Sequence, residues 1–211
     1  MTKINNLNNG TCSGKIGVLV PYIRRGKPYM RLAPTINPSN TPKQKSIRNK
    51  FKVSSQVLGR LSRIFTIGFN HIAKPGQTGY NTGLGYNIHS AMNEHDGEWS
   101  IDWSLVKVSC GSLANVKEVK IEPIENNKYR ISWNPNNGTS ASPDDLIYIA
   151  LYNEQINNSL WLVNGTAQRQ NLSIEIPSNP YLIPQFAHLY IFTKRKSNDL
   201  VSDSIYFQLP E

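Results

Sequence analysis

The first 93 residues of the chain contain no aspartate and no glutamate. They carry 14 of the 23 lysines and arginines and a formal charge of +14, whereas residues 94–211 carry 9 basic and all 14 acidic residues, a charge of −5. This asymmetry points to an anionic partner for the first part, or to contact between the two parts or between neighbouring copies in an assembly. The alternative is a domain that is merely basic, although ordinary composition seldom gives such a run.

Cysteine is scarce, and long apolar runs are missing. Cys12 and Cys110 exclude a disulfide framework and offer no C-x-x-C spacing for zinc, so we expect buried thiols. No run reaches the ~18 apolar residues of a membrane helix, and the opening "MTKINNLNNGTCSG" has no apolar core of a secretory signal. We therefore expect a cytoplasmic or virion protein, not secreted by a signal peptide and without a membrane partner.

The usual marks of catalysis are also missing. There is no G-x-S-x-G elbow, and the glycine-rich stretch at 76–83 lacks the G-K-[ST] ending of a phosphate loop. Asp144 and Asp145 fall in a predicted turn, and His71 and His89 fall on different predicted segments rather than at metal-ligand spacing. We predict a protein that is not an enzyme, with no metal, no cofactor and no small-molecule substrate.

The chain begins with a predicted basic arm and β-hairpin over residues 1–40. An apolar run at 16–23 meets the turn "RRGK", in which Gly26 permits a positive φ, and a return strand follows at 28–32. Pro21 inside the first run indicates an edge or bulged strand. The cationic tip suits contact with phosphates, and it equally suits an exposed, soluble turn.

Residues 41–95 are predicted to form a basic helical segment. Thr41, Pro42 and Gln44 carry the signals of a helix start. Positions spaced by four, three, four, three and four residues then predict a stripe to be buried, with cations on the opposite face. The stripe comprises Ile47, Phe51, Ser54, Leu58, Leu61 and Phe65. Gly59 is expected to bend or break the helix, and a second short helix is predicted over 84–95.

Short β-like runs follow, separated by turn sequences such as "NPNNGTSASPDD". The runs are 116–123, 129–133, 146–153, 159–163, 172–176, 188–193 and 204–209. Their number and spacing predict an immunoglobulin-like or fibronectin-type-III-like β-sandwich over 116–211, with Trp133 in its core and 96–115 as a connecting strand segment. The predicted fold class is α+β: an N-terminal hairpin and two-helix segment, then this sandwich.

Four separated stretches, "SGKIGVLVPYIRRGKPYMR", "TPKQKSIRNKF", "IDWSLVKVSCGSL" and "SDSIYFQLPE", occur in this order. In this the chain resembles an uncharacterised family of proteins of similar length from bacteroidete bacteria and their prophages. The resemblance implies a fibronectin-like C-terminal part and no catalytic residues.

Two functions remain open. The first is a structural or assembly protein, such as a virion component, whose basic half faces neighbouring protein subunits or packaged nucleic acid. The second is a stand-alone, sequence-tolerant DNA- or RNA-binding protein whose cations neutralise phosphates. Both use the same candidate binding residues. These are Arg24, Arg25, Lys27, Arg31, Lys43, Lys45, Arg48, Lys52, Arg60 and Arg63.

Overall fold

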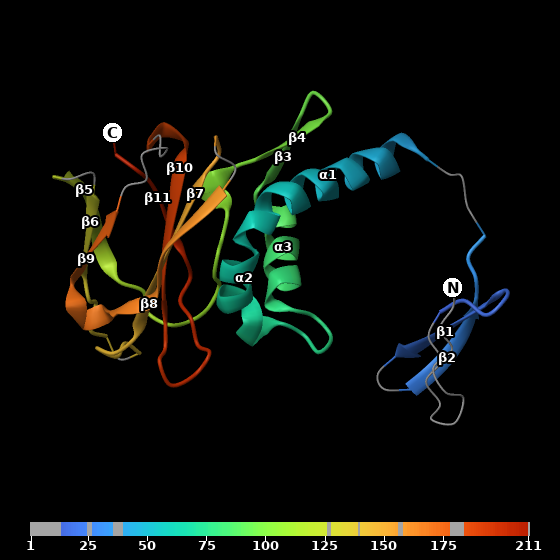
Figure 1. Cartoon of the computed structure of the whole chain (residues 1–211), viewed down its shortest axis with the longest axis horizontal. Coiled ribbons are helices and arrows are strands. Elements are labelled where there is room, and N and C mark those ends of the chain that lie inside the picture. Colours follow the sequence, from blue (N-terminus) through green and yellow to red (C-terminus); the bar gives the residue numbers. More distant parts are fainter. Residues whose placement is uncertain are drawn as a thin grey trace. The chain divides into compact units, whose positions relative to one another are not determined.

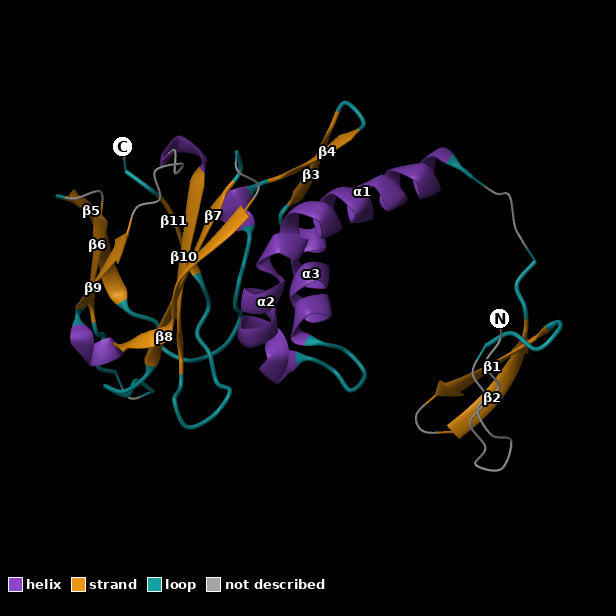
Figure 2. Ribbon diagram, in the orientation of Figure 1, coloured by secondary structure: helices purple, strands orange, loops and turns teal. Residues whose placement is uncertain are grey.

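The computed structural model describes residues 14–24, 27–35, 40–125, 128–138, 140–155, 158–177 and 184–210. The chain divides into two compact units, Met1–Pro42 and Lys43–Glu211. Each unit has its own architecture. The described residues contain both α-helices and β-strands, and the helices lie apart from the main sheets in the sequence, as in the predicted α+β class (Figure 2).

The first unit contains the predicted hairpin. Strands β1 (Leu19–Arg24) and β2 (Lys27–Leu32) pair antiparallel, with Tyr22 opposite Tyr29 and their rings stacked at 5.6 Å between centroids. Both strands are edge strands of a two-stranded sheet, so Pro21 in β1, which has no N–H to donate, interrupts no pairing with a third strand.

Three α-helices open the second unit. They are α1 (Pro42–Leu58), α2 (Ser62–Phe69) and α3 (Gly79–Ser90). A 3₁₀ turn at Gly59–Leu61 separates α1 from α2, so the predicted break at Gly59 is confirmed. A further 3₁₀ turn, Asn70–Ile72, follows α2.

The second predicted helix was misplaced. It begins at Gly79 rather than residue 84, because the Thr78 hydroxyl accepts a hydrogen bond from the Asn81 amide and caps the first turn. Two glycines of this stretch, Gly79 and Gly83, let α3 pack closely against α2. A Cβ at Gly79 would lie 2.6 Å from the Thr66 carbonyl oxygen, and one at Gly83 would lie 2.8 Å from the Phe69 ring.

The same helix ends earlier than predicted, because a short hairpin replaces its last residues. Strands β3 (Met92–His95) and β4 (Glu98–Ile101) pair antiparallel around Asp96 and Gly97, whose φ angles are 51° and 82°. The Asp-Gly pair is a hairpin signal that the sequence interpretation missed. A 3₁₀ turn, Trp103–Leu105, follows β4.

The remainder of the unit forms two antiparallel sheets. One has the order β5-β6-β9 and the other β11-β10-β7-β8 (Figure 1). Their strands are β5 (Lys117–Ile124), β6 (Lys128–Asn134), β7 (Leu146–Asn153), β8 (Asn158–Gln168), β9 (Ser173–Pro177), β10 (Ala187–Lys194) and β11 (Ile205–Gln208). Every predicted β-run overlaps one of these strands. Two more 3₁₀ turns, Arg169–Asn171 and Pro184–Phe186, join them.

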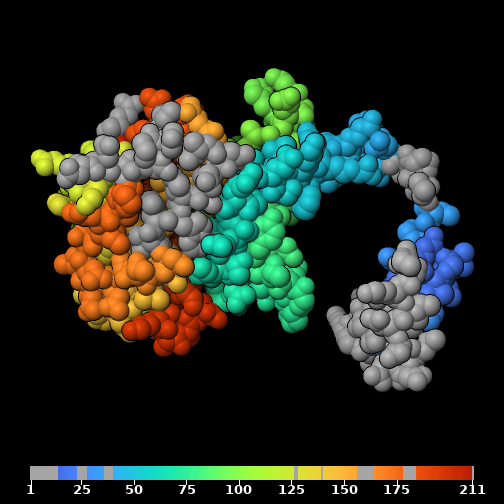
Figure 3. All heavy atoms as spheres, in the orientation of Figure 1, coloured from blue at the N-terminus to red at the C-terminus, as the bar shows by residue number. Residues whose placement is uncertain are grey.

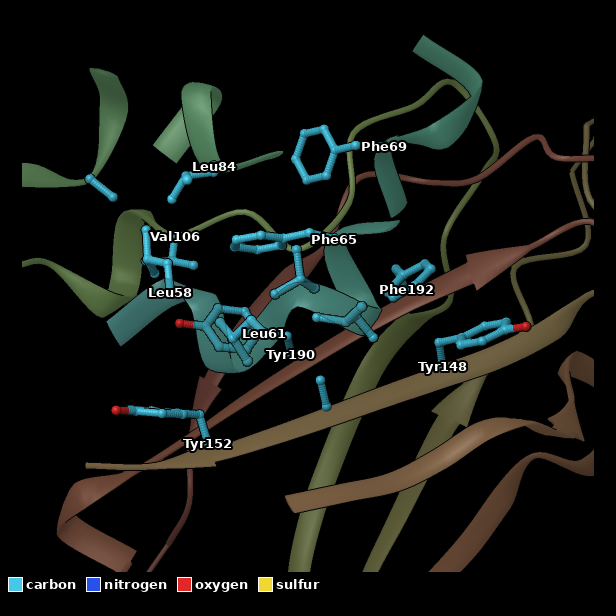
Figure 4. Packing of buried hydrophobic residues seen from close by; sticks show 14 of the residues in the cluster. Leu58, Leu61, Phe65, Phe69, Leu84, Val106, Tyr148, Tyr152, Tyr190 and Phe192 are labelled. Atoms are coloured by element: carbon cyan, nitrogen blue, oxygen red, sulfur yellow. The ribbon is translucent and has the colours of Figure 1, made fainter. Parts of the chain in front are cut away.

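The second unit has three layers and two apolar cores. The first core lies between the sheets and includes Trp133, as predicted, with Ile149 and Ile191. The second lies between the four-stranded sheet and the helices, where Leu61 and Phe65 gather with Tyr190 (Figure 4). Strands β7 and β10 are therefore buried on both faces. The helical segment packs on its own sheet.

Candidate functional site

The predicted binding residues fall on several elements. Lys43, Lys45, Arg48 and Lys52 lie on α1, while Arg60 lies in the 3₁₀ turn and Arg63 on α2; all six are exposed. Arg31 lies on β2, with its guanidinium 5.9 Å from the Tyr22 ring centroid. Arg25 lies outside the described residues, as do the side chains of Arg24 and Lys27.

The structure brings three of these cations together. At about 100° per residue, Lys45, Arg48 and Lys52 project from one side of α1 within about 60° of each other. We call these three residues the basic helix face. Lys43 lies in the first turn on a different side of the helix. The sequence of helix α1 itself contains no aspartate and no glutamate.

A different side of α1 is anchored by the β3–β4 hairpin. The Trp99 indole donates to the Ser46 hydroxyl at 3.1 Å, and that hydroxyl donates to Glu94 Oε1 at 3.2 Å. The Lys50 ammonium lies 4.4 Å from the Trp99 ring centroid, a cation–π contact. These contacts set the direction of α1, and sequence reasoning did not find them because they join residues about fifty positions apart.

The predicted apolar stripe is buried only in part. Ser54, Leu58, Leu61 and Phe65 are buried as expected, but Ile47 and Phe51 are each 57% exposed. Their expected burial is therefore wrong. The reason is geometric: within the second unit the N-terminal half of α1 extends past α2 and α3 (Figures 1 and 3). The apolar spacing therefore extends into the N-terminal half of α1, where α2 and α3 no longer cover the helix.

This arrangement leaves one apolar surface beside one cationic surface on α1. Ile47 and Phe51, one turn apart, form what we call the exposed apolar pair. At about 100° per residue Phe51 and Arg48 project about 60° apart, so the basic helix face borders the pair instead of lying opposite to it as predicted. An apolar pair needs an apolar partner to leave water, and the adjacent cations favour a partner that carries carboxylates or phosphates. Chemically the surface can bind, and nothing in it resembles a nucleophile with its base.

The described ranges offer neither a metal-binding cluster nor a membrane-spanning helix. No three His, Cys, Asp or Glu side chains gather there in a way that would hold a metal ion. In the same ranges no helix has the length and apolar character needed to cross a membrane.

Comparison with known proteins places the chain in a family. Residues 11–207 match the family of unknown function DUF6266. The chain belongs to the DUF6266 family. Membership of an uncharacterised family is thereby confirmed. No curated protein matches this DUF6266 chain. A solved structure titled "Myokine structure" aligns at 13% identity and a TM-score of 0.31, covering 47% of this chain and 100% of that one. A TM-score this low supports no structural comparison.

Proposed function

We propose that this DUF6266 protein is a non-enzymatic component of a larger protein assembly, and that it binds an acidic partner subunit through the N-terminal half of α1. The observation that carries this proposal is the exposed apolar pair, Ile47 and Phe51, beside a helix face of cations without carboxylates.

The two kinds of side chain support different parts of binding. Fully burying an isoleucine or a phenylalanine contributes about 1.5–3 kcal/mol each, so covering the pair gives a small docking site real affinity. The cations would speed encounter with an acidic surface and reject basic ones. An amphipathic helix laid into an apolar groove is a common recognition mode, and α1 has the side-chain spacing for it.

The two sheets fit the same role. We propose that they form a fibronectin-type-III-like sandwich, because an order of β5-β6-β9 facing β11-β10-β7-β8 matches that architecture in strand number and pairing. Such sandwiches serve in many assemblies, although the fold alone assigns no function. A virion is the assembly to test first, given the prophage setting that the sequence resemblance implies.

A second candidate function is sequence-tolerant nucleic-acid binding. The basic helix face favours it, since Lys45, Arg48 and Lys52 offer three positive charges on one side of a helix. Binding of this kind weakens with salt, with a log–log slope of about −0.9 for each phosphate neutralised. It makes no use of Ile47 or Phe51.

One experiment separates the candidates. Full-length protein is titrated with a helical Leu/Glu peptide about six turns long, with a Leu/Lys peptide of equal length, and with duplex DNA over a range of salt. Phe51→Ser removes half of the apolar pair, the triple variant K45E/R48E/K52E reverses the basic helix face, and Leu105→Ser changes an exposed leucine elsewhere as the matched control.

The assembly proposal expects the acidic peptide to bind, with a loss of at least about tenfold in both the Phe51→Ser and the charge-reversed protein, because a buried aromatic anchor contributes more than 1.4 kcal/mol. Leu105→Ser should bind like wild type. DNA binding that the charge reversal abolishes and Phe51→Ser leaves intact would support the second candidate. If neither the acidic Leu/Glu peptide nor duplex DNA binds, both candidate functions are refuted.

A further inference from the structure

A pocket opens between α1 and the end of β7, on a side of α1 separate from the basic helix face. Its volume is about 400 Å³, within the range of small-molecule sites. The described residues that line it are Val53, Val57, Ser100, Ile101, Trp103, Tyr152 and Glu154. They come from α1, β4, the 3₁₀ turn after β4 and the end of β7, four elements of the second unit. The walls are mostly aliphatic or aromatic, and Glu154 supplies a carboxylate.

That carboxylate is held by a buried histidine. Glu154 Oε1 lies 2.7 Å from His188 Nε2, and His188 Nδ1 lies 3.0 Å from the Tyr206 hydroxyl. Burial lowers the pKa of His188, so its ring is neutral at pH 7, donating from Nε2 to Glu154 and accepting from Tyr206 at Nδ1. The glutamate is thus oriented by a partner that does not cancel its charge.

The second oxygen of the Glu154 carboxylate, Oε2, is available to a ligand. Glu154 Oε2 makes no hydrogen bond with the described residues, and the side chain is 41% exposed whereas that of His188 is 7% exposed. One end of the carboxylate is therefore fixed and the other remains an acceptor. Trp103 stiffens the wall next to it, because its ring stacks on Tyr152 at 4.4 Å and on His188 at 4.8 Å between centroids.

We propose that this pocket binds a small organic cation, a protonated amine attached to an apolar or aromatic body. The body would leave water against Val53, Val57 and Ile101, and the ammonium would donate to Glu154 Oε2. A cation without an apolar body would make no use of the aliphatic walls, and a neutral apolar molecule would leave the carboxylate without a charged partner.

The local charges agree with a cation rather than an anion. Burial raises the pKa of the Tyr152 hydroxyl, Glu154 raises it further, and Arg60 opposes them more weakly. Among the described residues that line the pocket, Glu154 is the one that carries a formal charge, and that charge favours a cation. The proposal is independent of the docking role of α1, since neither Ile47 nor Phe51 lines the pocket.

Phenethylamine, which is protonated at pH 7, is a suitable probe. Binding is followed through the Trp103 indole signal in ¹H–¹⁵N spectra of the full chain, assigned with a Trp103→Phe variant. Its uncharged match is 2-phenylethanol and its anionic match is 3-phenylpropionate. Glu154→Gln removes the charge, Val57→Phe fills the pocket without altering Glu154, and Glu175→Gln, on β9 beside Arg130, is the control carboxylate.

We expect a saturable shift with phenethylamine. Its affinity should fall at least about tenfold in Glu154→Gln, and 2-phenylethanol should bind wild type at least about tenfold more weakly, because each change removes a charge-assisted hydrogen bond. Val57→Phe should weaken binding by a similar factor because the new side chain blocks the pocket. Glu175→Gln should bind like wild type. The proposal is overturned if the shift does not saturate by about 10 mM phenethylamine, a concentration above the Kd of even weak ligands. It is also overturned if the alcohol or the carboxylate binds as well as the amine, or if Val57→Phe binds phenethylamine as wild type does. The last outcome remains decisive even if Glu154→Gln does not fold.

Discussion

The division of the apolar stripe into a buried and an exposed part can be tested by one substitution made at two isoleucines. Ile64 on α2 is fully buried in the core between the helices and the four-stranded sheet, whereas Ile47 on α1 is 57% exposed. Both lie in α-helices, so replacement by alanine changes the same atoms in the same backbone conformation. The difference between the two effects therefore reports burial.

The expected costs differ severalfold. Ile64→Ala removes buried methyl and methylene groups and leaves a cavity, which typically lowers the free energy of unfolding by about 2–5 kcal/mol. Ile47→Ala should change it by no more than about 0.5 kcal/mol, because exposed positions contribute little and alanine is the better helix former. For a unit of this size the first variant should melt roughly 4–20 °C lower, at about 2–4 °C per kcal/mol.

Urea unfolding followed by circular dichroism measures both variants at low micromolar concentration, where weak self-association is absent. A loss of about 2 kcal/mol or more in Ile47→Ala, which is the range of core positions, would show that this chain itself buries Ile47. The proposed docking surface would then not exist. If the loss instead grows with protein concentration, Ile47 is covered by a second copy, and the partner of α1 is the protein itself.

Two further outcomes are expected. Gly68→Ala on α2 should lower the free energy of unfolding by about 1–3 kcal/mol, since its Cβ would lie 2.1 Å from the Val108 carbonyl oxygen. Gly85→Ala on α3, whose Cβ would have nothing within 4 Å, should be neutral or stabilising in the same urea assay. Wild-type stability should fall as the pH drops below about 6.5, because the folded protein holds His188 neutral and the unfolded chain binds the extra proton first. Stability titrations from pH 8 to pH 5 should show a smaller fall for His188→Gln, and an unchanged slope would contradict the assigned role of this histidine.

The strands could be predicted from the sequence because their signals are local. Strands such as β7 and β10 are short apolar runs, and each is followed by asparagine within a few residues. Strands β3 and β4 lack such a run and were missed. The run "LIYIALYN" in β7 also predicts where the helices pack. An uninterrupted apolar strand indicates burial on both faces, and here the second face belongs to α1 and α2. The packing of the helices on this sheet could have been predicted from that run.

Other features depend on contacts that no local pattern records. Arg169 is fully buried and ion-paired with Asp145 at 3.2 Å, although arginines usually lie on the surface. The pocket unites Val53, Ile101 and Glu154 from separate elements, and a lone glutamate at the end of a strand gives no sign of a neighbouring histidine. The cations of α1 were predicted, since charge and helical period are local, but the anchoring of α1 by Trp99 was not.

The exposed apolar pair is informative because the pattern and the burial disagree there. Helical periodicity marks Ile47, Phe51 and Leu58 alike as positions to be buried, yet the folded unit covers only Leu58. A helix end that served only to meet water would gain nothing from a phenylalanine and an isoleucine one turn apart, and adjacent exposed apolar side chains mark interaction sites. The part of the stripe that the second unit leaves exposed is therefore the part that we propose a partner covers.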